Sequence, residues 1–329
     1  MGIVRSLSRT CCIALLFVAV ANQAALAERW PLRPVTMIVP FGAGSGLDVL
    51  GRVLAAAMSE KLGQSVIVEN AGGAGGMTGA ARVAKAPPDG YTFVLGNVGT
   101  HAQNQSLYAR PLYDAAHDFA PVALIADTPQ VLIARADLPA DGLQAFIGYL
   151  KQNHARMQFG SPGAGSAAHL ACALFDAAAG VEITHVPYRG GGPAMQDLMA
   201  GRIDFQCPLI SLALPHVESG KVKAIAALTL RRSAILPSLA TAHEQGLDFE
   251  VSSWTALFLP KGTPPEIVAR LHDAVDAAID LPGIRDQLRQ IGVEPVPHEN
   301  RSPDFLQRFI EREIVNWAAA IKAAGLAPQ

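Results

Sequence analysis

The chain has 329 residues, with 26 lysines and arginines against 28 aspartates and glutamates, which gives a formal net charge of −2. Half of the residues are apolar and only 16% are charged, against a usual charged share of roughly 25%. The apolar fraction excludes a disordered chain, the balanced charge disfavours a dedicated nucleic-acid-binding protein, and the length suits about two domains.

Residues 1–27 have the features of a secretory signal peptide. Arg5 and Arg9 provide the positive start, residues 11–21 form an uninterrupted apolar run, and Ala25-Leu26-Ala27 offers a small-x-small cleavage pattern. The apolar run is too short to cross a bilayer, which needs roughly 20 residues. We therefore expect cleavage after Ala27 and export to the periplasm, and loss of the two arginines lowers the formal charge from −2 to −4.

Two of the four cysteines, Cys172 and Cys207, lie outside the predicted signal peptide. In an oxidising compartment they could form one disulfide. However, Cys172 lies in an apolar helical stretch and Cys207 at the end of a short predicted strand, without a C-x-x-C or Cys/His spacing. We predict two buried free thiols, because a free cysteine packs as a small hydrophobic residue, and keep the disulfide as the alternative.

Strands and helices alternate through most of the mature chain, beginning with a continuous apolar run at residues 35–39 that is typical of a buried strand. The other strands are predicted at residues 65–68, 91–95, 122–125, 130–134, 157–159, 183–186, 203–206 and 223–228, followed by an extended segment at 249–259. Named helices are predicted at residues 48–62, 76–85, 264–280, 282–290 and 304–323. This alternation favours mainly parallel sheets covered by helices.

Three glycine-rich turns follow predicted strands, at residues 42–46, 72–76 and 160–166, and the first and third run directly into a helix. Free backbone N–H groups at a helix start, together with the positive end of the helix dipole, can bind an anion without a charged side chain. For each turn the alternative is a tight turn with no ligand. Two strand–loop–helix arrangements in one chain favour an anion-binding cleft.

Familiar catalytic and nucleotide-binding motifs are absent. Residues 42–47 break the G-x-G-x-x-G pattern at Leu47, and no phosphate-binding G-x-x-x-x-G-K-[S/T] loop occurs. The nucleophile pattern G-x-S-x-G and the zinc pattern H-E-x-x-H are missing too. His101 and His169 follow predicted loops and could touch a ligand, although lone histidines more often serve as helix-start or packing residues. We predict no cofactor and no metal.

Several short segments, in their order and spacing, resemble the Bug receptors, the TctC-like extracytoplasmic solute-binding proteins of tripartite tricarboxylate transporters. The resemblance runs from about Trp30 to the C-terminus. It is carried by Val39-Pro40-Phe41 with the glycine turn and Asp48, Val66-Ile67-Val68-Glu69-Asn70, Pro88-Asp89-Gly90-Tyr91-Thr92, Asp118-Phe119-Ala120-Pro121-Val122, His185-Val186-Pro187-Tyr188-Arg189-Gly190, Leu214-Pro215-His216, Trp254 and Pro260-x-Gly262-Thr263-Pro264.

The resemblance implies a two-lobed periplasmic-binding-protein fold of type II (Venus-flytrap), each lobe a mainly parallel sheet flanked by helices. Residues 28–129 and 253–329 would form lobe 1, and residues 130–252 would form lobe 2. The ligand would be a small carboxylate-bearing organic anion, held by backbone amides, hydroxyls and bridging waters. The expected partners are this organic acid and the membrane subunits of a tripartite tricarboxylate-type transporter. No nucleic acid is expected, and the receptor would be a monomer.

The candidate ligand-binding residues lie in the loops and at the matching positions. In lobe 1 they are Phe41, Gly42, Gly44, Ser45, Gly46, Asp48, Asn97, Thr100 and His101. In lobe 2 they are Ser161, Gly165, Ser166, Ala167, Tyr188, Arg189 and Asp204. Asp48 either orders its turn or reaches a polar ligand group. Arg189 either lines the cleft or is a solvated surface charge, and Asp204, at the cleft-facing end of its strand, either contacts ligand or holds a neighbouring loop.

One departure from the family pattern concerns Leu47, where these receptors commonly carry a threonine. A hydrogen-bond donor is lost and an apolar group is gained, so the contact with ligand should be less polar. Two other functions remain open at this point. One is a secreted α/β hydrolase or lyase that uses Ser45 or Ser166, and the other is a ligand-sensing receptor without a transporter of its own.

Overall fold

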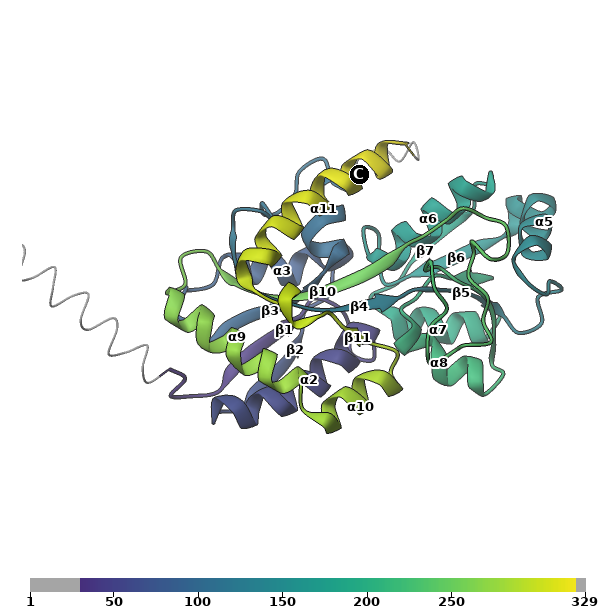
Figure 1. The fold of residues 1–329 in the computed structure, drawn as a ribbon. Helices are drawn as coiled ribbons and strands as arrows, with labels where there is room; N and C mark the ends of the chain where they lie inside the picture. The colour runs from purple at the N-terminus through teal and green to yellow at the C-terminus, as the bar shows by residue number, and fades with distance from the viewer. Residues whose placement is uncertain (1–29, 324–329) are drawn as a thin grey trace, which may run out of the picture.

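The structure is a computed structural model that describes residues 30–323, so the predicted signal peptide lies outside the described residues. Across residues 30–323 no helix combines the length and the apolar character needed to span a bilayer. The chain folds into two β-sheets flanked by helices, an α/β architecture as predicted (Figure 1).

The first sheet has six strands in the order β11-β4-β10-β3-β1-β2. Its strands are β1 (Val35–Val39), β2 (Val66–Asn70), β3 (Thr92–Asn97), β4 (Phe119–Pro129), β10 (Ser252–Pro260) and β11 (Glu294–Pro295). One face packs against α2 (Gly46–Leu62), α9 (Pro265–Ile279) and α10 (Pro282–Gln290). The other face packs against α3 (Met77–Ala84), α11 (Pro303–Ala323) and a π-helical turn (Gly99–Gln103), which leads into α4 (Asn104–Leu107).

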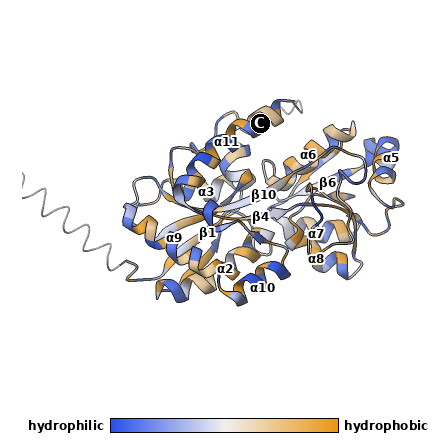
Figure 2. Cartoon of the chain, in the orientation of Figure 1, coloured by the Kyte–Doolittle hydropathy of each residue, from blue (hydrophilic) through white to orange (hydrophobic). Residues whose placement is uncertain are grey.

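The second sheet has five strands in the order β7-β6-β8-β5-β9. Its strands are β5 (Val131–Arg135), β6 (Gln158–Ser161), β7 (Thr184–Pro187), β8 (Phe205–Gln206) and β9 (Val222–Ala227). Helices α5 (Leu143–Asn153) and α6 (Ala167–Ala179) contribute to the core on one face, and α7 (Gly191–Met199) and α8 (Ile210–Glu218) to the core on the other. Helix α6 is largely hydrophobic and α10 largely hydrophilic (Figure 2), which agrees with the deeper burial of α6.

Most strands of each sheet point in the same direction, as expected of mainly parallel sheets, but each sheet also contains at least one strand of the opposite direction. In the first sheet β10 runs antiparallel to β3 and β4, and in the second β5 runs antiparallel to β8 and β9. The physical reason is the connection between the sheets. The chain leaves the first sheet at the end of β4 and returns to it at the start of β10, where Thr128 pairs with Ser253. Two neighbouring strands that carry the chain out and back must point in opposite directions.

Cys172 in α6 and Cys207 just after β8 form a disulfide, with their Cα atoms 5.5 Å apart. The prediction of two free thiols is therefore wrong, although both residues are fully buried as expected. Helix α6 packs over the second sheet, and this packing brings together two cysteines that are 35 positions apart in the sequence. Neither their spacing nor their apolar surroundings reveals this proximity.

Candidate functional site

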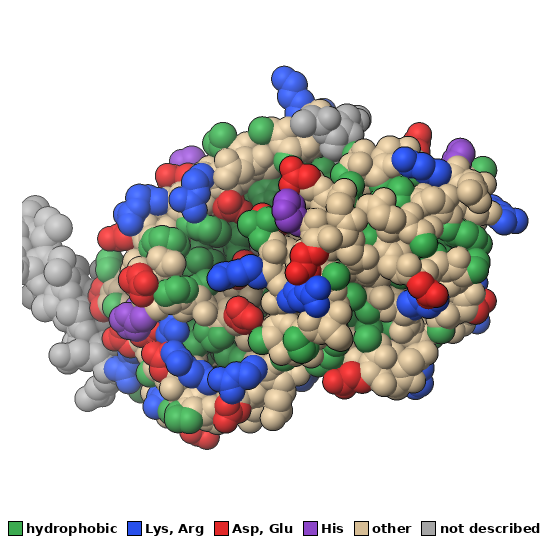
Figure 3. All heavy atoms as spheres, turned by 45° about the vertical axis from the view of Figure 1, so that its right-hand side comes forward, with side chains coloured by type: hydrophobic (Ala, Val, Ile, Leu, Met, Phe, Trp, Pro, Cys, Tyr) green, Lys and Arg blue, Asp and Glu red, His purple; other side chains and the backbone are tan. Residues whose placement is uncertain are grey.

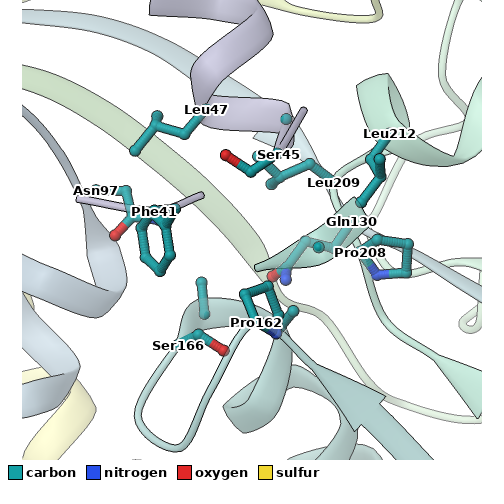
Figure 4. Close-up of a pocket in the computed structure, with 14 residues that line it drawn as sticks. Phe41, Ser45, Leu47, Asn97, Gln130, Pro162, Ser166, Pro208, Leu209 and Leu212 are labelled. Atoms are coloured by element: carbon teal, nitrogen blue, oxygen red, sulfur yellow. The ribbon is translucent and has the colours of Figure 1, made fainter. Parts of the chain in front are cut away.

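A small pocket with a cavity volume of about 40 Å³ lies between the loops of the two sheets. The first sheet and its helices contribute Phe41, Ser45, Gly46, Leu47 and Asn97. The second contributes Pro162, Ser166, Ala167, Ala168, Gly191, Pro208, Leu209 and Leu212, with Gln130 at the crossing between the sheets. Figure 4 shows these side chains surrounding one central space.

Two serine-capped helix N-termini open on this pocket. Ser45 Oγ accepts a hydrogen bond of 3.2 Å from the N–H of Asp48, at the start of α2. Ser166 Oγ accepts an equivalent bond of 3.2 Å from the N–H of His169, at the start of α6. Because each oxygen acts as an acceptor, each hydroxyl keeps its proton for a ligand. The free N–H groups and positive dipole ends of both helices add to these donors.

Two buried amide side chains complete the polar lining. Asn97 Oδ1 accepts a hydrogen bond from the N–H of Thr100 at 3.1 Å, which leaves the Asn97 amide nitrogen without a partner among residues 30–323. Gln130 Nε2 donates to the carbonyl of Cys207 at 3.1 Å, and Gln130 Oε1 has no partner in the described part of the chain. Both side chains are at least nine-tenths buried. The lining therefore holds several donors and one free acceptor.

Among residues 30–323 no charged side chain lines the pocket. In contrast, side chains of both charge signs are interspersed over the outer face of the molecule in view in Figure 3. An anion in this pocket would be held by hydrogen bonds and helix dipoles in place of a lysine or arginine. This arrangement suits an organic acid whose remaining atoms are apolar, because Phe41, Leu47, Leu209 and Leu212 contribute hydrocarbon to the lining.

Asp48 holds the turn that precedes α2 and does not line the pocket. Its carboxylate accepts hydrogen bonds from the N–H of Gly44 at 2.9 Å, from Asn70 Nδ2 at 2.9 Å and from Arg52 Nε at 3.1 Å. Burial alone would raise the pKa of Asp48, but these hydrogen bonds and the charge of Arg52 together hold that pKa below its usual value. Of the two roles considered for Asp48, the geometry favours ordering the turn.

Replacing Asp48→Asn should lower the free energy of unfolding by about 1–2 kcal/mol, because three donors lose a charged acceptor. The carboxylate has a lowered pKa in the folded state, so its stabilisation is present above the ordinary aspartate pKa of about 3.9 and is lost as the pH falls through lower values. Urea unfolding at pH 7 and pH 3 would measure this. The difference between the two proteins should be largest at pH 7.

A matched control for this change is Asp304→Asn, which alters an exposed carboxylate in the first turn of α11. That change should cost about 0.3–1 kcal/mol, since only the interaction with the helix dipole is lost. Equal losses in the two variants at pH 7 would contradict the role given to the Asp48 network.

Thr100 and His101 lie behind the pocket wall. Both are fully buried, and the ring of His101 stacks on Phe258 with 3.8 Å between ring centroids. Burial lowers the pKa of His101 to about 3, so this side chain is neutral at physiological pH. Thr100 Oγ1 accepts a hydrogen bond from the N–H of Asn97 at 2.9 Å. The structure therefore places these two residues where they orient Asn97 and not where they meet a ligand.

Ser161 and Gly165 shape the loop that precedes α6. Ser161 Oγ lies 2.7 Å from His185 Nε2 and also hydrogen-bonds the backbone of Gly163. Gly165 has a positive φ of 77°, and its N–H donates to His169 Nδ1 at 3.2 Å. Neither residue lines the pocket, whereas the adjacent Ser166 and Ala167 do.

The remaining polar candidates of the second sheet also lie outside the pocket lining. The Tyr188 hydroxyl donates to Asp197 Oδ2 at 2.8 Å, and the Arg189 side chain is exposed. Asp204 accepts hydrogen bonds from the N–H of Gln158 and from Arg135 Nε. It precedes β8, whereas Pro208 lines the pocket beyond the other end of that strand. The expectation that Asp204 ends the strand facing the cleft is therefore wrong, because the short strand begins one residue later.

Several residues that line the pocket were not predicted from the sequence: Gln130, Pro162, Ala168, Gly191, Pro208, Leu209 and Leu212. Pro208 and Leu209 connect β8 to α8 and so repeat the strand–loop–helix arrangement of the two glycine loops. Their loop contains no glycine and therefore gave no comparable signal. Gln130 lies where the chain was expected to cross between the lobes. Its position at this crossing could have marked it as a candidate pocket residue.

Loops from the two sheets touch each other around the pocket. A Cβ atom added to Gly42 would lie 3.0 Å from the carbonyl oxygen of Arg189, and one added to Gly75 would lie 2.4 Å from that of Ala164. The hydroxyl of Tyr108 donates to the same Ala164 oxygen at 2.7 Å. Gly42 and the second glycine turn, at residues 72–76, thus pack backbone to backbone against loops of the second sheet.

Two α/β units with a pocket between them are the arrangement of periplasmic solute-binding proteins. The chain belongs to the tripartite tricarboxylate transporter receptor family (TctC), whose family model matches residues 50–326. This result confirms the resemblance to the Bug and TctC-like receptors that the sequence segments indicated. The family consists of periplasmic solute-binding receptors.

Three solved structures are similar to nearly the whole chain. The periplasmic binding protein BugD is 37% identical, with a TM-score of 0.89 over 91% of this chain and 100% of that one. MatC from Rhodopseudomonas palustris, with bound malate, is 38% identical, with a TM-score of 0.86 over 89% and 100%. Rpa4515 from R. palustris, with adipate, is 39% identical, with a TM-score of 0.87 over 91% and 100%. The fold is thus that of the Bug-type periplasmic binding proteins.

Proposed function

We propose that this protein captures a small carboxylate-bearing organic anion in the pocket between its sheets and delivers it to the membrane subunits of a tripartite tricarboxylate-type transporter. The observation that carries the proposal is the convergence of two serine-capped helix N-termini on one pocket, which the described part of the chain lines without a charged side chain. Similar proteins with bound malate and adipate support a carboxylate ligand. Phe41, Ser45, Gly46, Asn97, Ser166 and Ala167 would contact it.

The working unit would be a monomer of two lobes, with the signal peptide removed after Ala27. Residues 28–129 and 253–329 would form lobe 1 and residues 130–252 lobe 2. The two sheets support this division, because the chain passes between them only at the junction of β4 and β5 and at the start of β10, within the described residues. Opening and closing would then require small backbone changes at these two crossings.

A hydrolase that uses Ser45 or Ser166 is less consistent with the hydrogen bonds at these positions. Each serine oxygen is bound by a helical N–H, and among residues 30–323 no histidine nitrogen is hydrogen-bonded to either hydroxyl. The nearby His169 accepts at Nδ1 from the N–H of Gly165. A nucleophilic serine requires a base within hydrogen-bond reach, so the geometry favours binding over catalysis.

Thermal unfolding of the mature protein in the presence of a panel of organic acids tests the proposal. A ligand at 100 times its Kd should stabilise the folded state by about 2.7 kcal/mol and raise Tm measurably. The double variant Ser45→Ala/Ser166→Ala should show a smaller shift with the same acid, because two hydroxyl donors are lost. If no carboxylate raises Tm while an uncharged solute does, the assignment of a carboxylate ligand is wrong.

A further inference from the structure

Two histidines adjoin the loop that joins β6 to α6, which forms one wall of the pocket. His169 lies in the first turn of α6, and His185 lies in β7. Their ring centroids are 4.1 Å apart. Neither side chain lines the pocket, but the loop contributes Pro162 and Ser166 to it, as Figure 4 shows. The pair can therefore act on a ligand through this loop.

His169 holds one end of the loop. Its Nδ1 accepts a hydrogen bond of 3.2 Å from the N–H of Gly165, which directly precedes the lining residue Ser166. An imidazole nitrogen accepts a hydrogen bond only while it carries no proton. Protonation at Nδ1 would replace the acceptor with a donor and leave the N–H of Gly165 without this partner. The bond therefore requires a neutral His169.

His185 adjoins the other end of the loop. Its Nε2 lies 2.7 Å from Ser161 Oγ, and Ser161 directly precedes the lining residue Pro162. The same hydroxyl hydrogen-bonds the N–H and the carbonyl oxygen of Gly163, at 3.2 and 3.0 Å. The two rings thus adjoin both ends of the segment that carries the lining residues.

The pair is enclosed by apolar surroundings that favour neutral rings. Phe159 packs beside both, with its ring centroid 6.1 Å from that of His169 and 4.9 Å from that of His185. Burial lowers the pKa of His169 to about 4. Burial, together with repulsion from His169, lowers the pKa of His185 to about 3. Both rings are therefore neutral at pH 7.

Within the described residues, the elements that touch this pair or its loop offer no other group that titrates between pH 5 and 7. Strands β6 and β7 carry no further ionisable side chain, and Cys172 of α6 is in the disulfide. Burial raises the pKa of Asp176 in α6 to about 8 and raises that of Tyr108 at the end of α4. Asp176 and Tyr108 are therefore largely protonated throughout this range.

The loop also meets the first-sheet side of the pocket. The Tyr108 hydroxyl donates to the carbonyl oxygen of Ala164 at 2.7 Å, and Ala167 packs into the core beside the first sheet. Loosening of the loop at Gly165 would therefore disturb both the pocket wall and the contact between the two sides.

We propose that His169 is a positioning residue that makes ligand binding sensitive to acid: the neutral ring holds the α6 loop in its binding conformation, and the protonated ring releases it. His185 supports this role by covering the His169 ring and by contacting Ser161. The proposal rests on the proposed function, since it assumes that the organic anion binds beside Pro162 and Ser166.

The sign of the effect follows from the lowered pKa of His169. The ordered loop disfavours the protonated ring, so its advantage over a loosened loop is complete above the ordinary histidine pKa of 6.5 and is lost as the pH falls toward 4. A ring that regains the ordinary pKa when the loop loosens would weaken binding by about 20-fold between pH 7 and pH 5. Partial exposure of the ring gives a smaller effect, so we expect about 3- to 20-fold.

The test is isothermal titration of the mature protein with succinate, malate, adipate and benzoate at pH 7 and pH 5. In His169→Asn the amide oxygen lies close to the position of Nδ1, where it can accept from Gly165 but does not titrate. The loss of affinity between pH 7 and pH 5 should be about 3- to 20-fold smaller in this variant than in the unaltered protein. Protonation of the acid itself affects both proteins equally and cancels in the comparison.

Two further variants separate positioning from general structural damage. His169→Phe keeps a ring but removes the acceptor, so it should bind the same acid at least about 5-fold more weakly at pH 7, and His169→Asn should recover most of this loss. His154→Asn is the matched control, because His154 is an exposed histidine of the same α/β unit and lies outside the pocket lining. This variant should keep the full pH dependence.

A second measurement needs no ligand. In protein labelled with nitrogen-15 glycine, the nuclear magnetic resonance signal of the Gly165 N–H should shift as the pH falls from 7 to 4. The shift should be absent in His169→Asn and present in His154→Asn, because only the first variant replaces the titrating partner of this N–H group.

Two results would overturn the proposal: an equal pH dependence of affinity in the unaltered protein and His169→Asn, or a Gly165 signal that titrates equally in both. In either case acids still bind at pH 7, so the proposed function would stand. If no acid of this set or of the wider panel binds at pH 7, the proposed function itself is wrong, and the Gly165 signal then decides whether His169 holds the loop.

Discussion

The double variant Cys172→Ala/Cys207→Ala should unfold with a free energy about 3–4 kcal/mol lower than that of the oxidised protein. The disulfide closes a loop of about 35 residues, and the chain-entropy model gives a stabilisation of this size for such a loop. The bond ties α6 to the segment that follows β8, and both cysteines are part of the core of the second sheet. Urea unfolding under oxidising conditions would measure the difference.

The reductant supplies the control for this prediction. The unaltered protein should lose stability when it is unfolded in dithiothreitol, whereas the double variant should respond little. A thiol titration of the unfolded, unreduced mature protein should find neither Cys172 nor Cys207 free. Two reactive thiols in that titration, together with identical unfolding of the two proteins, would contradict the disulfide and restore the interpretation as buried free cysteines.

The effect should extend to the pocket, because α6 contributes Ser166, Ala167 and Ala168 to its lining. The disulfide joins Cys172, near the middle of this helix, to Cys207, which directly precedes the lining residue Pro208. It therefore connects two segments that reach the pocket from the same sheet. A crosslink of this kind restricts the motion of these two segments before the ligand binds. Less conformational entropy is then lost on binding.

Elements with a strong periodic or apolar pattern were predicted well. The first strand, Val35–Val39, has the predicted bounds, and α10 (Pro282–Gln290) does too. Helix α2 begins at Gly46, two residues earlier than predicted, because Ser45 caps it. The two-residue strand β11 and the π-helical turn (Gly99–Gln103) were missed. Neither has a pattern of its own, because β11 exists through its pairing with β4.

The part of the candidate site that the sequence indicated is the pair of helix N-termini that follow glycine turns. Glycine turns followed by Ser45 and Ser166 are local signals, and the structure brings both caps to one pocket. The side chains that give the pocket its individual character, Gln130 and Leu212 among them, are ordinary residues in the sequence. They become part of a site only through the crossing of the chain and the packing of α8 beside the pocket. No local pattern could have selected them.

The turn at residues 72–76 provides the second prediction of large effect. Replacing Gly75→Ala should weaken ligand binding by on the order of 100-fold, because a Cβ atom there would lie 2.4 Å from the carbonyl oxygen of Ala164 and 2.6 Å from the carbonyl carbon of Gly165. Those atoms are backbone on the opposite side of the pocket, so they cannot rotate away. Relief requires the loops to separate, which breaks the bond from Tyr108 to Ala164 and depopulates the closed conformation.

Gly63→Ala separates this effect from backbone strain. Gly63 ends α2 with a φ of 68°, close to the 60° of Gly75, but an added Cβ there would meet no atom within 4 Å. Both variants should lose about 1–2 kcal/mol of stability from the left-handed backbone conformation. Only Gly75→Ala should lose affinity for the acid that binds the unaltered protein best, and only this variant should fail to become more compact in small-angle scattering when that acid is added. Equal affinities in the two variants would mean that contact between the glycine turns is not needed for binding, and closure would then depend on the ligand alone.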